Sequence, residues 1–458
     1  MQTIIKNGTI VTESERFKAD LLIAAGKIQA VGTGFAETGA QVLDAAGQYV
    51  LPGAVDVHTH ISLQAGACHT TDDFFTGTRS AACGGTTSVI EHLAFGPKGC
   101  SLRYQIEQYK KAAAGKAVID YGLHGVIQQV TEETLREMEE LAREGIQSFK
   151  IYLTYNFAID DAGCLRVFQK AKELNTPIAV HCENDSLVNY NRARLVAEGK
   201  TAPKYHALSR PNEVEAEAVD RMIHIAHLAG DAPLYIVHLS ARESLKAVRE
   251  ARARGQQHIY VETCPQYLLL TEDAYEREDG LKFVMSPPLR KADDCRALWE
   301  GLADGTVDVV ATDYCPFNYK TDKQLGKGDF TKCPNGGTGI EERVMALFSE
   351  GVMQGRITLE QFVKLLCTNP ARIYGAYPRK GAIQPGADAD LLLIDPQGRG
   401  ELTLKKLHGV VDYTCYEGLQ LRGALKLVLS KGEIVCRDGQ FTGRAGAGVF
   451  LARQVQPK

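Results

Sequence analysis

The sequence predicts an α/β protein that contains a (β/α)8 barrel of the TIM type and a small β-sandwich domain built from both termini. Two observations lead to this prediction. In the middle of the chain, eight short apolar runs rich in β-branched residues alternate with amphipathic helical stretches, as in a barrel of parallel strands. At both ends, short strand-like segments are separated by glycine turns, which is typical of an antiparallel sheet or sandwich.

The two termini are expected to form the sandwich together, from residues 1–50 and 376–458. The strand-like segments that open the chain lie at 3–11, 20–23, 27–31 and 41–44. Two more, at 389–395 and 426–432, close it. The larger domain is therefore expected as an insertion between the two halves of the smaller one.

The inserted barrel is expected over residues 51–375. Its apolar runs lie near Val55 and at 87–90, 118–123, 148–153, 178–181, 234–238, 259–261 and 307–312. Helical stretches lie between them, for instance at 132–144, 213–228 and 241–253. A doubly wound open sheet would alternate in the same way. Its dinucleotide-binding version needs a glycine-rich phosphate motif after the first strand, and Gly84-Gly85-Thr86-Thr87 lacks that spacing, so the barrel is favoured.

Composition narrows the functional classes. The 458 residues carry a formal net charge of −4, which indicates neither a nucleic-acid-binding protein nor one that binds an anionic membrane. No apolar stretch approaches a membrane span, and the N-terminus lacks the apolar core of a signal peptide, so a cytoplasmic location is expected. The twelve cysteines include no CxxC pair and are expected to be reduced and mostly buried, with Cys182 and Cys315 as packing residues.

Five of the apolar runs end in residues that can bind a metal. Those residues are His58, His60, Lys150, His181, His238 and Asp313. Side chains two apart on a strand point to the same side, and the carboxyl ends of barrel strands meet at one mouth. Four imidazoles, a carboxylate and a lysine at that mouth predict a binuclear metal site, with zinc as the usual ion and manganese or cobalt as alternatives.

A histidine taken alone more often satisfies a hydrogen bond in the core or in a loop. That interpretation weakens when four of the twelve histidines end barrel strands. His92 ends the second run and is a candidate to support a ligand or to lie in a lid. The remaining histidines are expected to be structural or on the surface: His69, His124, His206, His224, His227, His258 and His408.

Lys150 requires a separate argument. An ammonium buried beside two cations is opposed both by desolvation and by like charge, so the lysine tends to lose its proton. A neutral amine can react with CO₂, and the resulting N6-carboxylysine has two anionic oxygens that can bridge two metals. A lysine that extends its ammonium from a strand end to water is the common alternative. With metal ligands around it, the carboxylated form is favoured.

The motifs that carry these residues resemble those of the cyclic amidohydrolases, in the hydantoinase and dihydropyrimidinase branch. They are Asp56-Val57-His58-Thr59-His60, Ser148-Phe149-Lys150, Val180-His181-Cys182-Glu183-Asn184, Val237-His238-Leu239-Ser240, Glu262-Thr263-Cys264-Pro265-Gln266-Tyr267, Ser286-Pro287-Pro288-Leu289-Arg290, Pro334-Asn335-Gly336-Gly337 and Gly386-Ala387-Asp388-Ala389-Asp390-Leu391. The resemblance covers essentially the whole chain. Within the branch, residues 72–79, 84–87, 95–100 and 205–211 resemble the bacterial D-phenylhydantoinases most.

This resemblance implies a barrel with a sandwich, two zinc ions per subunit, a carboxylated Lys150 and a homotetramer. By position, His58 and His60 would bind one metal together with Asp313, and His181 and His238 would bind the other. Lys150 would bridge the two. The chain departs from many relatives at Tyr314, where they have histidine or glutamine after the aspartate, and this change would affect how Asp313 is oriented or relays its proton.

The resemblance also implies a mechanism. A hydroxide between two metals attacks a ring carbonyl of a cyclic diamide, and Asp313 acts as general base and then as general acid. Tyr155 matches the tyrosine that donates to the developing oxyanion. Ser286 and Asn335 match positions whose backbone groups hold the ring amides. An apolar lining for the ring substituent is expected from Leu63, Leu93, Phe95 and Phe157.

The expected activity is hydrolysis of 5-substituted hydantoins, with D-enantiomers bearing aromatic side chains preferred. A dihydropyrimidinase that opens dihydrouracil or dihydrothymine is the alternative, because the same residues would serve it. An allantoinase or dihydroorotase matches less well. A non-catalytic scaffold relative is disfavoured because all six ligand positions are filled. The expected partner is a small cyclic diamide, with no nucleic acid and no membrane.

Overall fold

The computed structural model describes residues 2–66 and 68–455, and it contains the predicted barrel. Eight strands form one sheet in chain order, and neighbouring strands are parallel. They are β8 (Ala54–Thr59), β11 (Thr86–His92), β12 (Asp120–Val126), β13 (Phe149–Tyr152), β14 (Ile178–His181), β15 (Leu234–Ile236), β16 (Ile259–Thr263) and β17 (Val309–Val310). Each of the eight apolar runs contains one of these strands or overlaps it, so the predicted fold class is confirmed.

The first and last strands close the barrel through the segment that follows β17. Thr59 and Tyr314 form a parallel bridge, and the His60 N–H donates to the Tyr314 carbonyl at 2.8 Å. The Thr312 hydroxyl donates to the Asp56 carboxylate at 2.7 Å. This closure matters for the site, because it brings Asp313 beside the two histidines of the first strand.

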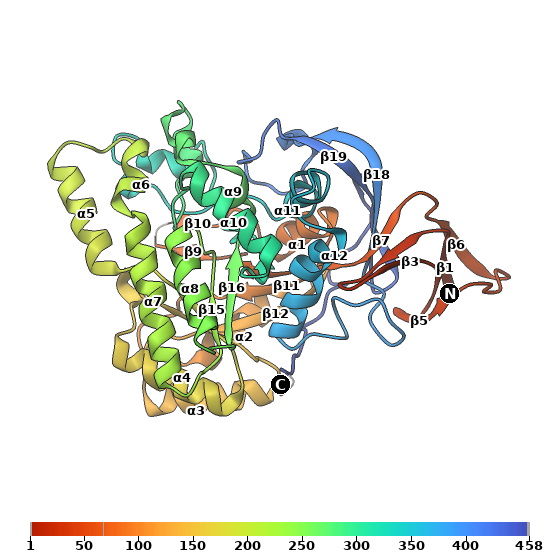
Figure 1. The fold of residues 1–458 in the computed structure, drawn as a ribbon, viewed down its shortest axis with the longest axis horizontal. Helices are drawn as coiled ribbons and strands as arrows, with labels where there is room; N and C mark the ends of the chain where they lie inside the picture. The colour runs from red at the N-terminus through yellow and green to blue at the C-terminus, as the bar shows by residue number, and fades with distance from the viewer. Residues whose placement is uncertain (1, 67, 456–458) are drawn as a thin grey trace.

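Helices between the strands cover the outside of the barrel (Figure 1). The α-helices are α1 (Phe74–Cys83), α2 (Leu102–Ala113), α3 (Glu132–Arg143), α4 (Asp161–Leu174), α5 (Asp185–Ala197), α6 (His206–Ser209), α7 (Asn212–Leu228), α8 (Arg242–Ala253), α9 (Pro265–Leu269), α10 (Ala292–Asp304), α11 (Arg343–Leu347), α12 (Leu359–Val363) and α13 (Asn369–Ile373). Short 3₁₀ or π segments are η1 (Tyr155–Phe157), η2 (Pro203–Tyr205), η3 (Glu272–Glu276), η4 (Gly280–Phe283), η5 (Lys323–Gly326), η6 (Phe330–Lys332), η7 (Phe348–Val352), η8 (Lys364–Thr368) and η9 (Leu404–Lys406). Two short strands, β9 (Gln64–Ala65) and β10 (Cys68–His69), pair after β8.

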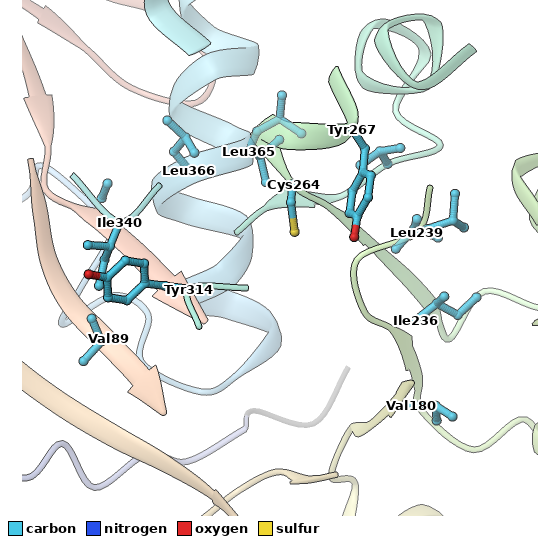
Figure 2. Close-up of a cluster of buried hydrophobic side chains, with 14 of the residues drawn as sticks. Val89, Val180, Ile236, Leu239, Cys264, Tyr267, Tyr314, Ile340, Leu365 and Leu366 are labelled. Carbon is cyan, nitrogen blue, oxygen red and sulfur yellow. The ribbon is translucent and has the colours of Figure 1, made fainter. Parts of the chain in front are cut away.

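Alternation along the barrel strands separates two apolar clusters. Val180 and Ile236 belong to the large apolar cluster, in which Figure 2 labels them. Their neighbours Ala179 and Tyr235 belong to a separate cluster inside the barrel. Because side chains alternate with a period of two, His181 lies on the same side as Ala179. The inward side of a strand thus carries apolar packing low in the barrel and a polar group at the mouth.

The sandwich consists of two sheets built from both ends of the chain. The four-stranded sheet has the order β5-β4-β1-β6 and the seven-stranded sheet the order β21-β20-β19-β18-β7-β2-β3. The strands are β1 (Gln2–Lys6), β2 (Thr9–Val11), β3 (Arg16–Lys18), β4 (Asp20–Ala24), β5 (Lys27–Gly32), β6 (Ala40–Asp44), β7 (Tyr49–Pro52), β18 (Leu391–Glu401), β19 (Gln420–Ser430), β20 (Glu433–Arg437) and β21 (Gln440–Phe441). The N-terminal β7 pairs antiparallel with the C-terminal β18. This pairing joins the two halves of the domain.

Two features connect the sandwich to the barrel. The exact boundaries between the two domains remain a prediction. The buried Lys380 ammonium lies 2.8 Å from Asp120 of β12 and 2.7 Å from Asp390, which precedes β18. The end of the chain then returns to the barrel, where the Leu451 N–H donates to the Tyr121 carbonyl at 2.7 Å. The last described residues come after the sandwich strands in sequence but pack against the barrel.

None of the helices in the described part of the chain is long and apolar enough to cross a membrane. All twelve cysteines lie in that part and none forms a disulfide. Eleven of them are buried and Cys100 is half-buried.

Candidate metal centre

Three of the predicted ligands converge at the mouth of the barrel. The Nε2 atoms of His58 and His60 each lie 3.1 Å from Oδ1 of Asp313. One ligand atom from each residue lies within 4.8 Å of the others. Ligand atoms that each lie about 2 Å from a zinc ion are separated by roughly 3–4 Å. The separations of Asp313 from the two imidazoles therefore match those of ligands on one cation, and the three residues form a candidate site for it.

The other two predicted histidine ligands form a second pair beside the first. His181 ends β14, His238 follows β15, and the Nδ1 atom of His181 lies 2.9 Å from Nε2 of His238. The rings of His58 and His238 are stacked with their centroids 5.4 Å apart. The two pairs thus lie next to each other, as two neighbouring metal positions require.

Two buried glutamates determine which ring nitrogen faces inward. Glu262 lies 2.6 Å from Nδ1 of His58, and Glu183 lies 2.7 Å from Nε2 of His181. Burial alone would raise the pKa of Glu183, but Arg210 and His181 hold it below its ordinary value, so this carboxylate is ionised and only accepts. Nε2 of His181 therefore carries the proton, and Nδ1 keeps its lone pair for a ligand. Burial raises the pKa of Glu262 to about 8, so at His58 the contact orients the ring and leaves Nε2 facing Asp313. Burial lowers the pKa of His58 well below its ordinary value and also lowers the pKa of His181. Both rings are therefore neutral, the form that binds metals.

Lys150 lines the same site, and its Nζ atom lies 5.0 Å from the centre of the Tyr152 ring. It is in β13, it is fully buried, and among the described residues its Nζ atom has no hydrogen-bond partner. Burial lowers the pKa of Lys150 to about 8. At neutral pH about a tenth of such a lysine population carries the neutral amine.

One cavity of about 80 Å³ unites the site. Its lining includes all six predicted ligands and the three predicted catalytic or substrate-binding residues, namely His58, His60, Lys150, His181, His238, Asp313, Tyr155, Ser286 and Asn335. Tyr152, Cys315 and Gly336 complete it. Neutral imidazoles, a carboxylate and an unpartnered buried amine are a donor set that fits divalent cations. The residues present therefore suit the metals that the sequence predicts.

Three of these residues have unusual backbone conformations. The φ angles are 68° at Tyr155, 39° at His238 and 53° at Asp313. Residues other than glycine rarely adopt the left-handed region, and such strain is held where a side chain must be aimed. The Tyr155 N–H donates to the Asp185 carboxylate at 3.1 Å, which helps to hold the turn.

Two loop segments carry Ser286 and Asn335 to the cavity. The Gly336 N–H donates to the Val284 carbonyl at 3.1 Å, which joins the two segments directly. A Cβ atom at Gly336 would lie 2.2 Å from the Cys315 carbonyl oxygen, so only glycine fits this close approach. The sequence motif around Asn335 is thus explained by packing between the loops.

The four residues predicted to line an apolar pocket do not line this cavity. Phe95 and Phe157 stack with ring centroids 3.5 Å apart, and Phe95 also contacts Tyr152 of the cavity wall at 5.2 Å. Leu63 packs against Cys315 in a small apolar cluster. Leu93 is buried in the main core. Phe95 and Leu63 therefore pack against residues that line the cavity, and Phe157 packs on Phe95. Leu93 packs in the core.

The remaining histidines have other environments. His92 lies beside the site, with its ring 4.3 Å from that of His58 and stacked on His124 at 4.1 Å. His124 contacts the Val57 carbonyl and Ser148, and His408 pairs with Glu341. Tyr314 points away from the metal centre: its hydroxyl donates to Asp72 at 2.6 Å, and its ring packs beside Val89 and Ile340 in Figure 2.

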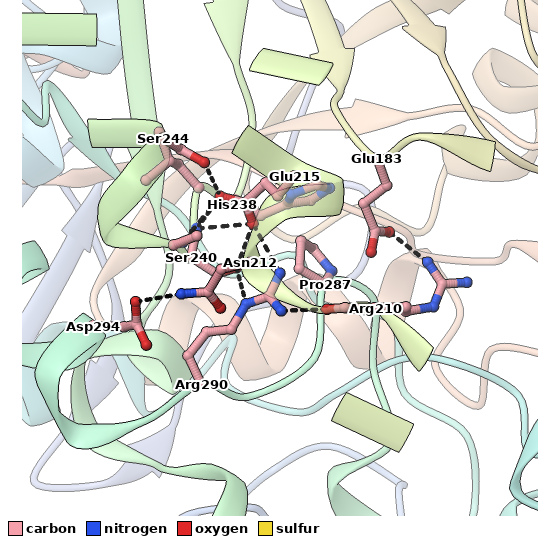
Figure 3. A network of polar contacts seen from close by, with 12 residues as sticks. Glu183, Arg210, Asn212, Glu215, His238, Ser240, Ser244, Pro287, Arg290 and Asp294 are labelled. Atoms are coloured by element: carbon pink, nitrogen blue, oxygen red, sulfur yellow. Dashed lines mark hydrogen bonds and ion pairs between the residues drawn. The ribbon is translucent and has the colours of Figure 1, made fainter. Parts of the chain in front are cut away.

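Sequence reasoning missed the supporting carboxylates. Glu262 is an acidic residue inside the apolar strand β16, and Glu183 lies two residues after His181. Both positions could have indicated from the sequence that these carboxylates lie beside the ligands. Figure 3 shows Glu183 bound to Arg210, at 2.5 Å, next to a second network around Glu215. Glu215 accepts from the backbone N–H groups of Ser240 and Ala241 and from Arg290. These networks hold the loop that follows His238.

Residues 49–435 match the amidohydrolase family. The chain belongs to this family. This amidohydrolase is 50% identical over 455 residues to a D-phenylhydantoinase of Escherichia coli O1:K1 / APEC, and the match covers 99% of this chain and 98% of that protein. The predicted family is thus confirmed.

Solved structures of the same family have the same fold. A dihydropyrimidinase from Brevibacillus agri NCHU1002 superposes with a TM-score of 0.97 at 43% identity, over 100% of both chains. A D-hydantoinase from a Bacillus sp. AR9 has the same TM-score of 0.97 and 43% identity, also over 100% of both chains. Barrel and sandwich together are therefore the architecture that this amidohydrolase shares with these relatives.

Proposed function

We propose that this amidohydrolase opens the ring of 5-substituted hydantoins by hydrolysing a cyclic amide bond, with D-enantiomers bearing aromatic side chains preferred. The observation that carries the proposal is the convergence of four imidazoles, Asp313 and the unpartnered Lys150 on one cavity. The names of the E. coli and Bacillus relatives support the substrate class.

The proposed site holds two divalent metal ions, which we propose to be zinc, with manganese or cobalt as alternatives. His58, His60 and Asp313 would hold one, His181 and His238 the other, and Lys150 would lie between them. When bound, such ions polarise a carbonyl and lower the pKa of water to about 7. Glu262 and Glu183 would keep the His58 and His181 lone pairs directed at the ions.

Lys150 is proposed to be N6-carboxylysine. Its neutral amine adds to CO₂, so that one N–C bond forms and one proton leaves, and the product is an anionic carbamate. The low pKa that burial gives this amine supplies the reactive neutral form. The carbamate would replace a cation that has no partner by an anion with two ligand oxygens.

Asp313 is proposed to move the proton. Burial works to raise the pKa of Asp313, but the imidazoles of His58 and His60 outweigh it and hold the pKa below the ordinary value. Asp313 is therefore ionised and can accept a proton from the attacking water. As the ring C–N bond breaks, the same proton passes to the departing nitrogen, which leaves a carbamoyl amino acid.

Tyr155 is proposed to donate to the oxygen that becomes negative as water adds to the ring carbonyl. Burial raises the pKa of Tyr155, so the phenol keeps its proton at neutral pH. The ring lies 5.5 Å from that of His181, which places the phenol beside the metal ligands. Backbone groups of Ser286 and Asn335 would hold the ring amides, and Leu63, Leu93, Phe95 and Phe157 would contribute to the surroundings of the ring substituent.

The substrate proposal predicts a clear order of activities. With zinc and bicarbonate present, kcat/KM for D-phenylhydantoin is expected to exceed those for L-phenylhydantoin and dihydrouracil by at least about tenfold, since one well-placed contact contributes about 1.4 kcal/mol. Ring opening can be followed by the loss of ultraviolet absorbance. The proposal would be wrong if dihydrouracil were opened rapidly and neither hydantoin were a substrate.

A dihydropyrimidinase is the second candidate, since the Brevibacillus agri relative at 43% identity is named as one. Dihydrouracil is also a cyclic diamide, and the residues that open its ring would be the same. The assay above separates the two candidates, because it measures both substrates on one preparation.

Tyr155→Phe tests the proposed oxyanion donor. Loss of one such donor costs about 10²–10³ in kcat, while the phenyl ring keeps its packing against His181. We expect kcat on D-phenylhydantoin to fall by that factor, with the metal content unchanged by elemental analysis. Tyr104→Phe, at an exposed position of α2, is the matched control and should retain wild-type activity. A kcat of Tyr155→Phe within threefold of wild type would exclude the role.

A homotetramer and a cytoplasmic location are part of the proposal. Helix α5 exposes Leu187 and Tyr190, at 43% and 66%, which supports a contact between subunits. Twelve cysteines without a disulfide are compatible with a reducing compartment. Light scattering on the purified protein would give the mass of the oligomer.

A further inference from the structure

Behind the two loops that carry Ser286 and Asn335 lies a buried lysine that the proposed mechanism does not use. Lys323 begins η5 and is 0% exposed. Its Nζ atom donates to three backbone carbonyls, those of Val284 at 2.7 Å, Pro334 at 3.0 Å and Gly336 at 2.7 Å. An ammonium has three donors and no acceptor, so these three bonds saturate it.

The Lys323 site is unusual for a buried charge. Within the described residues Lys323 forms hydrogen bonds through Nζ to carbonyl oxygens alone and no ion pair. Burying a charge without a counter-charge is costly, because only dipoles replace the lost water. A lysine retained at such a cost, between the two loops that line the cavity, indicates a role in holding them.

The three acceptors belong to both loops. Val284 lies two residues before Ser286, whereas Pro334 and Gly336 flank Asn335 on either side. The Val284 carbonyl also accepts from the Gly336 N–H at 3.1 Å, so Lys323 binds where the loops already touch. One side chain therefore fixes the spacing of the two segments.

The contact with Pro334 has an electronic consequence as well. The Pro334 carbonyl and the Asn335 N–H belong to the same peptide group. A cation on the carbonyl oxygen draws electron density from the amide nitrogen and makes its N–H a stronger donor. Among the described residues, the Asn335 N–H donates no hydrogen bond, although Asn335 lines the cavity.

The loop that carries Ser286 has a similar contact, in which a buried side chain donates to the carbonyl of the preceding residue. The Nε2 atom of His206, which is 2% exposed, lies 2.7 Å from the Met285 carbonyl. A carbonyl can only accept, so Nε2 carries the proton. The Met285 carbonyl shares its peptide group with the Ser286 N–H, which also donates to no group in the described residues. Burial lowers the pKa of His206 to about 3, so this ring stays neutral.

We propose that Lys323 and His206 are positioning residues that hold the peptide groups at Asn335 and Ser286, so that backbone groups of the two loops meet the ring amides of the substrate at a fixed spacing. This inference rests on the proposed function, because it assigns the ligand of these peptide groups to a cyclic diamide. Buried peptide groups that lack a partner are costly unless a ligand completes them. Neither residue touches the metal ligands or the reacting atoms.

The peptide groups at Asn335 and Ser286 would hold the substrate both before and during the reaction. Loss of one supporting charge is therefore expected to raise KM by about 10- to 100-fold, because a hydrogen bond to or from a charged group contributes about that factor. The kcat should change by less than about threefold, which is the signature of uniform binding. A residue needed only for folding would instead lower the amount of active enzyme without changing KM.

The test uses the full-length, metal-loaded enzyme and two matched pairs. Lys323→Met removes the charge at nearly constant length, Lys323→Arg keeps it, and Lys327→Met removes an exposed lysine four residues away. His206→Leu removes the donor, and His206→Gln keeps an N–H near the same place. We expect KM for D-phenylhydantoin to rise in Lys323→Met and His206→Leu, to lie closer to wild type in Lys323→Arg and His206→Gln, and to be unchanged in Lys327→Met.

A second measurement does not depend on turnover. Hydrogen–deuterium exchange of peptides that cover residues 283–287 and 333–337 is expected to become at least tenfold faster in Lys323→Met, with the metal content unchanged. Unchanged exchange in both loops, or a KM within threefold of wild type in both Lys323→Met and His206→Leu, would overturn the inference. If Lys323→Met does not fold, the His206 pair decides.

The two proposals fail in different ways. If the wild type opens no cyclic amide, the proposed function is wrong, and the ligand assigned to the peptide groups of the two loops is wrong with it, whatever the exchange shows. If the wild type is active and the Lys323 and His206 variants behave like the control, the proposed function stands and the positioning role is wrong.

Discussion

Replacing Lys150 with alanine is expected to lower kcat/KM on D-phenylhydantoin by at least about 10³-fold and to reduce the bound metal from two ions per chain to one or fewer. Lys150 lines the cavity together with the five other proposed ligands, its Nζ atom has no hydrogen-bond partner in the described residues, and its proposed carbamate would be a ligand of the ions. Losing a bridging anion removes ligands from both positions, and water activation depends on both ions. Steady-state kinetics and elemental analysis measure the two effects.

Two further preparations sharpen this experiment. Lys150→Met has no amine but fills the space, so it should behave like Lys150→Ala and show that packing is not the cause. Mass spectrometry of the native wild type should detect the mass of one CO₂ per chain, which disappears in both variants. An alanine variant that kept both metals and most of its activity would refute the bridging role.

Replacing Lys380 with methionine is expected to lower the free energy of unfolding by about 3–5 kcal/mol, the usual cost of removing one partner from a buried ion pair. Lys380 is 1% exposed and lies within 3.0 Å of Asp120, Asp388 and Asp390. These carboxylates raise the pKa of Lys380 against the opposing effect of burial, so the lysine is charged. Without it, the buried Asp390 has no side-chain cation within the described residues, whereas Lys431 still pairs with Asp120 and Lys27 with Asp388. Urea unfolding followed by circular dichroism measures the change.

Lys426→Met is the matched control for this prediction. Lys426 also pairs with an aspartate, Asp438, but both side chains are exposed, at 41% and 55%. Pairs in water contribute about 0–1 kcal/mol, so this variant should unfold almost as the wild type does. A Lys380→Met variant that lost no more than Lys426→Met would show that the buried cluster does not hold the two domains together.

Much of the fold was predictable because it follows from local patterns. The eight apolar runs had the length and composition of buried strands, and each contains a barrel strand or overlaps one. The return of the chain end to the barrel was not predictable. Leu451 and Arg453 lie in a segment without clear periodicity, and their partners Tyr121 and Leu123 are more than 300 residues away in sequence.

At the site, too, some residues could be predicted from the sequence and others could not. The predicted ligands and Tyr155 line one cavity, because each lies in a strand or shortly after one that could be located from sequence. Ser286 and Asn335 also line it, but they lie in loops, and only the resemblance to the family pointed to them. The four residues of the predicted apolar lining do not line this cavity: Phe95 and Phe157 stack on each other, Leu63 packs against Cys315, and Leu93 is buried in the main core. Glu262 was overlooked, since an acidic residue in an apolar strand shows its role only when the facing strand is known.

The sequence by itself determined the fold class, the family and the types of group at the barrel mouth, because strand periodicity and motif spacing are local properties of the chain. Only the tertiary structure decided which nitrogen of each histidine faces inward, that Tyr314 points away from the site, and that Lys323 and His206 support the two loops. These facts depend on contacts between segments far apart in the chain, such as Lys323 with Val284 and His58 with Glu262. No local pattern encodes such contacts, because closure of the barrel creates them.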